Sequence, residues 1–340
     1  MRKCSIITCV LIIFILSIVP GCTGDNAERK VVVYTSVDQV FSEPVLKDFE
    51  KQTGIKVYPA YDVEAAKTTG LVNRLIAEKK RPQADVFWNS EIIQTILLKQ
   101  KGVLTPYNSA NAKDLPAKLK DGQGYWTAFG GRARVLIVNK NMVVPEQYPS
   151  SIFDLTKDTW PADKVAMAYP MFGTTATHAA ALYESMSPAK AKAFYQSIQK
   201  RGVKIVDGNS VVRDMVASGQ LMWGVTDTDD AAGAVSKGAP VAVIYPDQED
   251  MGTFIIPNSV GLVAGAPHRQ EAQQFIDYLL SVETEKKLIE ADFIQIPTRP
   301  LPKESKSTVP RDLKTMDVDF NKIYDYLNQT KTELAEVFVR

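Results

Sequence analysis

Short apolar runs alternate with amphipathic helical patterns along most of the chain. Residues 31–35 and 84–88 each predict a buried strand, and apolar residues at three- and four-residue spacing predict a helix after each strand. The first of these helices is expected at 42–53, with Ser42 and Pro44 as its start signals. Repeated strand–helix units build mostly parallel sheets with helices on both faces, so the alternation places the chain in the α/β class.

The alternation continues through a length of 340 residues, which suits two domains better than one. Further strands are expected at 55–61, 164–170, 203–207, 221–225 and 240–246. Further helices are expected at 67–80, 90–102, 189–202, 210–219, 270–280 and 319–338, and one is expected to begin at Thr174 or Thr175. The proline-rich segment 296–304 predicts an extended connector.

An uncharged, mostly aliphatic stretch at residues 6–19 follows a short basic start. It is shorter than the roughly 20 apolar residues of a membrane span and fits the apolar region of a secretory signal. It ends just before Cys22 in a sequence that resembles a bacterial lipoprotein processing site. We therefore expect residues 1–21 to be a signal peptide, Cys22 to be lipidated and residues 22–29 to form a tether. An uncleaved anchor or another cleavage point stays open; each reading places the folded part in the periplasm or another extracytoplasmic space.

The remaining composition excludes several kinds of site. All three cysteines, Cys4, Cys9 and Cys22, lie in the leader, so neither a disulfide nor a thiolate metal site is expected in the folded part. Two histidines, His178 and His268, are too few for a zinc site of the usual type. We expect His178 on a helix flank and His268 at a helix cap or on the surface.

The chain shows no signature of enzymatic or nucleotide chemistry. A formal net charge of +1 does not favour nucleic acid as a partner. There is no glycine-rich phosphate loop and no Gly-x-Ser-x-Gly motif, and nothing in the sequence singles out a catalytic triad. We therefore expect a monomer that is not an enzyme and holds no cofactor or resident metal.

Polar side chains gather where the predicted strands give way to helices. Each one alone predicts a helix N-cap. Because ligands of open α/β sheets bind beyond the carboxyl ends of the strands, the whole set predicts a shared hydrogen-bonding cavity. The helix starts there would favour an anion. The candidate residues are Thr35, Ser36, Thr68, Thr69, Asn89, Ser90, Gly173, Thr174, Thr175, Asn209, Ser210, Thr226 and Asp227.

Four segments together resemble the extracellular solute-binding proteins of ABC importers, and most closely the branch of periplasmic ferric-ion-binding proteins. The similarity runs from about Lys30 to about Pro297. It is carried by residues 31–57 (VVVYTSVDQVFSEPVLKDFEKQTGIKV), 81–91 (RPQADVFWNSE), 130–141 (GGRARVLIVNKN) and 266–281 (APHRQEAQQFIDYLLS).

The resemblance implies a two-lobed periplasmic-binding-protein fold of type 2. Each lobe would hold a mixed, mostly parallel sheet flanked by helices, and the ligand would lie in the cleft between the lobes. Strands that cross between the lobes are expected near residues 130–132 and 245–246. Lobe 1 would then comprise residues 30–131 and 246–300, and lobe 2 residues 132–245 and 301–340, with the C-terminal helix on lobe 2. The partners implied are a small-molecule ligand, a membrane permease and, through the lipid anchor, the membrane itself.

The ferric-binding relatives hold their metal with adjacent tyrosines, often helped by a histidine and a glutamate. Here the tyrosine region matches residues 225–230 (VTDTDD), which contain no tyrosine. The histidine position matches Asp38, and the glutamate position matches Ser90 or Glu91. Phenolates are strong ligands for ferric iron and hydroxyls are not, which argues against iron binding in the relatives' manner. An alternative retains ferric iron, held by Asp38, Glu91, Asp227 or Asp229 with an anion at Arg132.

Arg132 matches a position that, in the family, lies near the bound ligand or its anion. An arginine at this position can clamp a carboxylate or phosphate with two hydrogen bonds. Arg134 is expected to point the opposite way along the strand. Thr226 and Asp227 are expected to face the cleft.

Asp229 and Asp230 are expected in the first turn of the next helix, facing water. A zwitterion would then bind with its amine at Asp227 and its acid group at Arg132. The favoured solute is thus a small anion or zwitterion, such as an amino-phosphonate or a carboxylate. Ferric iron and a secreted hydrolase on the same scaffold are the alternatives.

Overall fold

The computed structural model describes residues 28–62, 69–299, 309–310 and 312–339. The expected signal peptide, the lipidation site Cys22 and the candidate ligand residue Thr68 lie outside these ranges. Among the described residues, no helix is both long and apolar enough to cross a membrane.

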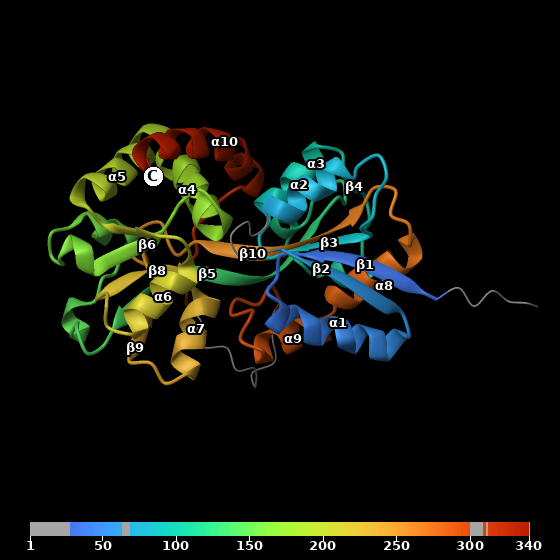
Figure 1. Cartoon of the computed structure of the whole chain (residues 1–340), viewed down its shortest axis with the longest axis horizontal. Helices are drawn as coiled ribbons and strands as arrows, with labels where there is room; N and C mark the ends of the chain where they lie inside the picture. The colour runs from blue at the N-terminus through green and yellow to red at the C-terminus, as the bar shows by residue number, and fades with distance from the viewer. Residues whose placement is uncertain (1–27, 63–68, 300–308, 311, 340) are drawn as a thin grey trace, which may run out of the picture.

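The chain forms two α/β lobes that lie side by side (Figure 1). In each lobe three parallel strands form one side of the sheet: β2-β1-β3 in the first lobe and β7-β6-β8 in the second. The strands of the first lobe are β1 (Lys30–Thr35), β2 (Lys56–Tyr61), β3 (Val86–Asn89) and β4 (Leu104–Thr105). Those of the second are β6 (Val165–Ala168), β7 (Lys204–Val206), β8 (Trp223–Asp227) and β9 (Val241–Ile244).

Two long antiparallel strands join the sheets. β5 (Thr127–Asn139) pairs with β10 (Ile255–Val263) through Ala133, and with β8 and β9 from Arg134 onward. Every residue of β5 is buried, so this strand belongs to the cores of both lobes. The change of partner falls close to the crossing expected near residues 130–132. The lobe boundaries expected from the sequence stay predictions.

Helices cover both faces of each sheet because their apolar stripes pack on buried strand residues. On the first lobe these are α1 (Gln39–Thr53), α2 (Thr69–Ala77), α3 (Ile93–Gln100), α8 (Arg269–Leu279) and α9 (Val282–Glu290). On the second they are α4 (Gly173–Met186), α5 (Pro188–Arg201), α6 (Asn209–Ala217), α7 (Thr228–Ser236) and α10 (Phe320–Val337). The C-terminal helix α10 packs on α4 and α5 and also touches α3 of the first lobe (Figure 1).

Two helices differ from the sequence expectation. α1 begins at Gln39, three residues earlier than expected, and Pro44 lies inside it. The earlier start allows Phe41 to stack on Phe293 at a ring distance of 4.9 Å, a tertiary contact that local start signals do not reveal. The helix α9 was not expected at all; it is capped by Ser281, whose Oγ accepts a hydrogen bond from Thr284 N at 3.1 Å.

Gly130 marks an irregularity in β5 that only glycine accommodates. The pairing of β5 with β10 shifts register at this residue, and Gly130 has a φ of +50°. A Cβ there would lie 2.1 Å from Cδ1 of Ile294.

We expect Gly130→Ala to lower the free energy of unfolding by about 2–4 kcal/mol, because left-handed strain and a core clash add. Gly122→Ala, whose Cβ would meet nothing within 4 Å, should change it by no more than about 0.5 kcal/mol. Urea unfolding of both variants checks this. Equal effects of the two substitutions would contradict the role given to Gly130.

Candidate functional site

A cavity of about 220 Å³ lies between the lobes, beyond the carboxyl ends of β3, β6, β7 and β8. Most of the candidate residues from the strand–helix junctions line it. They are Ser90, Gly173, Thr174, Thr175, Asn209, Ser210 and Asp227; Asp38 and Arg132, named from the family resemblance, line it too. The junctions therefore converge in one place.

The other described candidates support the cavity from behind or lie apart from it. Thr35 accepts a hydrogen bond from Val37 N at 3.1 Å, so it serves its own turn. Ser36 donates to Asn89 Oδ1 at 2.6 Å, and both side chains are buried. Thr226 is fully buried; its hydroxyl donates to the backbone carbonyl of Asn209 at 3.1 Å. Thr69 lies at the start of α2 beside a separate small cavity.

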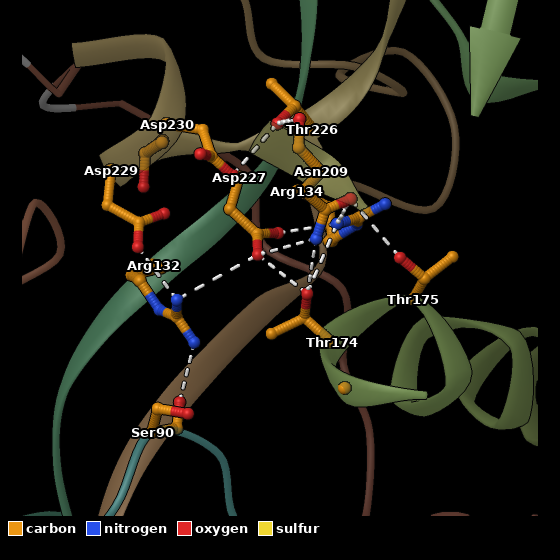
Figure 2. Close-up of polar contacts among 12 residues, drawn as sticks. Ser90, Arg132, Arg134, Thr174, Thr175, Asn209, Thr226, Asp227, Asp229 and Asp230 are labelled. Atoms are coloured by element: carbon orange, nitrogen blue, oxygen red, sulfur yellow. Dashed lines mark hydrogen bonds and ion pairs between the residues drawn. The ribbon is translucent and has the colours of Figure 1, made fainter. Parts of the chain in front are cut away.

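Arg134 lies directly behind the cavity and anchors Asp227 (Figure 2). Its Nη1 donates to Asp227 Oδ1 at 2.6 Å and to Asn209 Oδ1 at 3.0 Å, and its side chain is fully buried. The expectation that Arg134 points away from Arg132 is wrong. Side chains alternate along a strand, so residues two apart share a face, and both arginines reach toward Asp227.

Both carboxylate oxygens of Asp227 already accept hydrogen bonds from the protein, which leaves little room for a ligand. Its Oδ2 accepts from the Thr174 hydroxyl at 2.6 Å and from the Asn209 amide at 3.1 Å. Burial alone would raise the pKa of Asp227, but the guanidinium groups of Arg134 and Arg132 outweigh burial, and the net pKa is lowered. Asp227 is therefore an ionised structural centre that joins β5, β8, α4 and α6.

Arg132 carries the second buried ion pair of the site. Its Nη1 lies 2.8 Å from Asp229 Oδ2 and 3.9 Å from Asp227 Oδ2, and its Nη2 donates to the backbone carbonyl of Ser90 at 2.7 Å. Burial acts to lower the pKa of Arg132, but Asp229 and Asp227 raise it overall, so the guanidinium stays charged.

The expectation that Asp229 and Asp230 face water is wrong. Both lie in the first turn of α7, as predicted, but they line the cavity and are paired. Asp229 neutralises Arg132, and Asp230 Oδ1 lies 3.0 Å from Arg213 Nη1. Burying a guanidinium group without a counter-charge costs much more free energy than leaving it in water. This cost favours an orientation in which the carboxylates of Asp229 and Asp230 point toward the arginines.

Three carboxylates and a charge imbalance define the acidic wall. Asp227, Asp229 and Asp230 offer oxygen atoms within 4.8 Å of one another, so their spacing could hold a metal ion. Asp229 Oδ1 is buried without a partner among the described residues. Five aspartates and two arginines line the cavity, and Arg134 lies behind them, so carboxylates exceed guanidiniums by two. The lining attracts a positively charged group.

A second wall of the cavity, formed by two helix starts, is suited to an anion. Helices α4 and α6 both begin at the cavity, and their N-cap residues, Phe172 and Gly208, provide no capping side chain. The first backbone N–H groups of a helix have no partner within the helix, and the helix dipole adds partial positive charge. Two such helix starts, together with Ser210, which also lines the cavity, can bind a phosphonate or carboxylate group.

Neither histidine faces this cavity. His178 lies in α4, stacked on Phe254 at 5.2 Å. Burial and the charge of Arg134 lower its pKa to about 3, so it is neutral. His268 precedes α8 and contacts Asp85 through its Nδ1 at 2.9 Å, in agreement with the expected cap position.

Several residues of the site were not found from the sequence. They are Arg134, Tyr169, Phe172, Asp207, Gly208, Arg213 and Asp230; Asp229 was named only as a ligand in the ferric-iron alternative. Arg213 follows Asn209 by four residues, one helical turn, and helical spacing could have indicated it. The two-residue spacing from Arg132 could have indicated Arg134.

Three comparisons relate the chain to known proteins. Residues 84–325 match the model of the family described as bacterial extracellular solute-binding protein. The Fe(3+)-binding periplasmic protein of Serratia marcescens is 25% identical over 263 residues, 76% of each chain. A putative 2-aminoethylphosphonate-binding periplasmic protein of Salmonella typhimurium is 24% identical over 275 residues, 78% of this chain and 77% of that protein.

Solved structures have the same fold. The ferric binding protein from Campylobacter jejuni superposes with a TM-score of 0.81 at 23% identity, covering 91% of this chain and 100% of that one. The expected two-lobed α/β fold is thereby confirmed.

We expect Asp227→Asn to lower the free energy of unfolding by about 3–5 kcal/mol, because it leaves Arg134 buried without its counter-charge. Asp158→Asn, whose side chain is fully exposed, is the control and should have an effect below about 1 kcal/mol. Urea unfolding at neutral pH measures both. A loss no larger than in the control would rule out the anchoring role of Asp227.

The same pair predicts a pH dependence. The folded-state pKa of Asp227 lies below the value of about 3.9 for an unfolded chain. The contribution of the ionised carboxylate to the free energy of unfolding is therefore complete above that value. The contribution is lost as the pH falls through the folded-state pKa. The stability difference between wild type and Asp227→Asn should therefore be constant from pH 5 to 7 and narrow below about pH 4. A difference that widens on acidification would contradict the assignment.

Proposed function

Because the chain belongs to the bacterial extracellular solute-binding protein family, we propose that it captures a small solute outside the cytoplasmic membrane for the permease of an ABC importer. A curated relative is described as a probable ABC transporter periplasmic-binding protein, at 29% identity. We propose that the solute is a zwitterion with a phosphonate or carboxylate group at one end and an amine at the other.

The observation that carries this proposal is the division of the cavity into two walls of opposite character. The uncapped starts of α4 and α6 offer hydrogen-bond donors to an anion. The acidic wall offers acceptors to a cation, among them Asp229 Oδ1, which is buried without a partner among the described residues. A solute that carries both charges can bind at both walls, whereas a simple anion would leave Asp229 Oδ1 without a donor.

The structure changes which residue is proposed to bind the amine. Asp227 is occupied by Arg134, Thr174 and Asn209, so we no longer assign the amine to it. We propose Asp229 and Asp230 instead. Arg132, tied to Asp229 and to the Ser90 carbonyl, holds the acidic wall in place and does not clamp the anion by itself.

We further propose that Cys22 carries a lipid anchor that keeps the protein at the membrane. The support is the leader sequence, because the residues concerned lie outside those described. We also propose that the protein acts as a monomer and as a binding protein without catalysis. The residues that line the cavity include neither histidine nor cysteine, so a hydrolase has no support there.

Ferric iron is the second candidate, favoured by the three carboxylates with oxygen atoms within 4.8 Å. The names of the Serratia and Campylobacter proteins also favour it. Against iron, two of the three carboxylates neutralise buried arginines. Among the described residues that line the cavity there is one tyrosine, Tyr169, and it follows β6 and is not part of the acidic wall. The glutamate of this reading, Glu91, does not line the cavity.

A panel of solutes distinguishes the two candidates. We expect 2-aminoethylphosphonate at a hundredfold excess over its Kd to add about 2.7 kcal/mol to the free energy of unfolding. Ethylphosphonate, which lacks the amine, should bind at least tenfold more weakly. Thermal unfolding with each compound, with inorganic phosphate and with ferric citrate measures this. If only ferric citrate stabilises the protein, the proposed zwitterion is wrong and ferric iron is the solute.

Two substitutions test the two walls separately. Asp229→Asn should raise the Kd of 2-aminoethylphosphonate about tenfold, because a charged hydrogen bond is lost, and should leave that of ethylphosphonate within about twofold. Ser210→Ala should raise the Kd of 2-aminoethylphosphonate and that of ethylphosphonate about fivefold each, since one neutral hydrogen-bond donor to the anion is lost. Isothermal titration measures both constants. If Asp229→Asn weakens both compounds equally, the assignment of the amine fails.

A further inference from the structure

Glu91 is a buried carboxylate of the first lobe that faces the second lobe instead of the cavity. It is 1% exposed. It accepts hydrogen bonds from the backbone N–H groups of Ile93 at 2.5 Å and Gln94 at 2.8 Å, and so caps α3. A further contact comes from α4 of the other lobe, where the Thr177 hydroxyl lies 3.4 Å from Glu91 Oε2.

An opposite charge lies across the same boundary. Lys331 of α10 and Glu91 line one small cavity of about 10 Å³, which α2, α3, α4 and α10 enclose. Burial lowers the pKa of Lys331, and the charge of Glu91 partly offsets this effect. The pKa of Glu91 is raised overall, because burial outweighs its hydrogen bonds and Lys331, which act in the opposite direction. Because α10 packs on both α4 and α3, these two side chains share a cavity only when the lobes lie as they do here (Figure 1).

A chain of hydrogen bonds leads from Glu91 to the wall of the solute cavity. The Asn89 amide donates to Glu91 Oε1 at 3.0 Å, and the Ser36 hydroxyl donates to Asn89 Oδ1 at 2.6 Å. Ser36 Oγ accepts from Ser90 N at 2.9 Å, and the Ser90 carbonyl accepts from Arg132 Nη2 at 2.7 Å. All five side chains are buried, so a shift of Glu91 is passed on through close contacts.

We propose that Glu91 is a positioning residue that couples closure of the two lobes to the shape of the solute cavity. Thr177 contacts it from the second lobe, and Lys331 of the same lobe lines the small cavity beside it. Asn89 and Ser36 relate its position to Ser90 and Arg132. The part of the proposal that concerns the solute rests on the proposed function; the contact between the lobes does not.

Lys331→Met tests the contact between the lobes. Its control is Lys322→Met on an exposed turn of the same helix. In the full chain, with Cys4, Cys9 and Cys22 replaced by serine, spin labels at Lys47 and Val235, both exposed, report the distance between the lobes. Without solute, Lys331→Met should shift the distances to longer values, and Lys322→Met should match the parent. Unchanged distances in Lys331→Met would overturn the proposal, whether or not a solute is found.

Glu91→Gln tests the coupling to the cavity. It keeps an oxygen that can cap α3 but replaces the carboxyl group that shares a cavity with Lys331 by a neutral amide. We expect Glu91→Gln and Lys331→Met each to raise the Kd of 2-aminoethylphosphonate about tenfold, and the double variant to be no weaker than either single variant. Additive losses, or equal losses of thermal stability without a change of distance, would show that Glu91 is merely structural. If 2-aminoethylphosphonate does not bind, the distance measurement still decides the proposal.

Discussion

The buried ion pair between Arg134 and Asp227 is the interaction on which the site depends. It ties the central strand β5 to β8, and through Thr174 and Asn209 it fixes the starts of α4 and α6. Removing two charges from water is expensive, and the cost is recovered only when geometry and hydrogen bonding are good. Here the two helix starts supply those hydrogen bonds. The main effect of the pair is therefore to fix one arrangement of β5, β8, α4 and α6, and its net contribution to the free energy of unfolding is secondary.

The second ion pair, between Arg132 and Asp229, has a different character. It lies at the cavity surface, and Asp229 retains one buried oxygen without a partner among the described residues. A group that is only half satisfied favours a further donor. The two pairs thus have different roles. The Arg134–Asp227 pair fixes the scaffold, and the Arg132–Asp229 pair leaves one carboxylate oxygen at the acidic wall that a ligand can bind.

Local patterns were sufficient for the α/β class, and the family resemblance supplied the two lobes. The polar junctions predicted that Ser90, Thr174 and Asn209 would lie together, and all three line the candidate cavity. What failed depended on tertiary pairing. Whether Asp229 faces water is decided by Arg132, which is 97 residues distant in the sequence. The occupation of Asp227 by Arg134 is likewise invisible in the pattern of β8 alone.

The continuity of β5 has a mechanical consequence. Because one hydrogen-bonded strand belongs to both sheets, the lobes cannot swing apart as if joined by a slack tether. Relative motion must bend or twist the backbone ribbon itself, whose hydrogen-bond ladder is interrupted where the register shifts at Gly130. Such a joint confines the lobes to a narrow arc of travel, so release of a captured molecule would follow a defined trajectory and not a random opening.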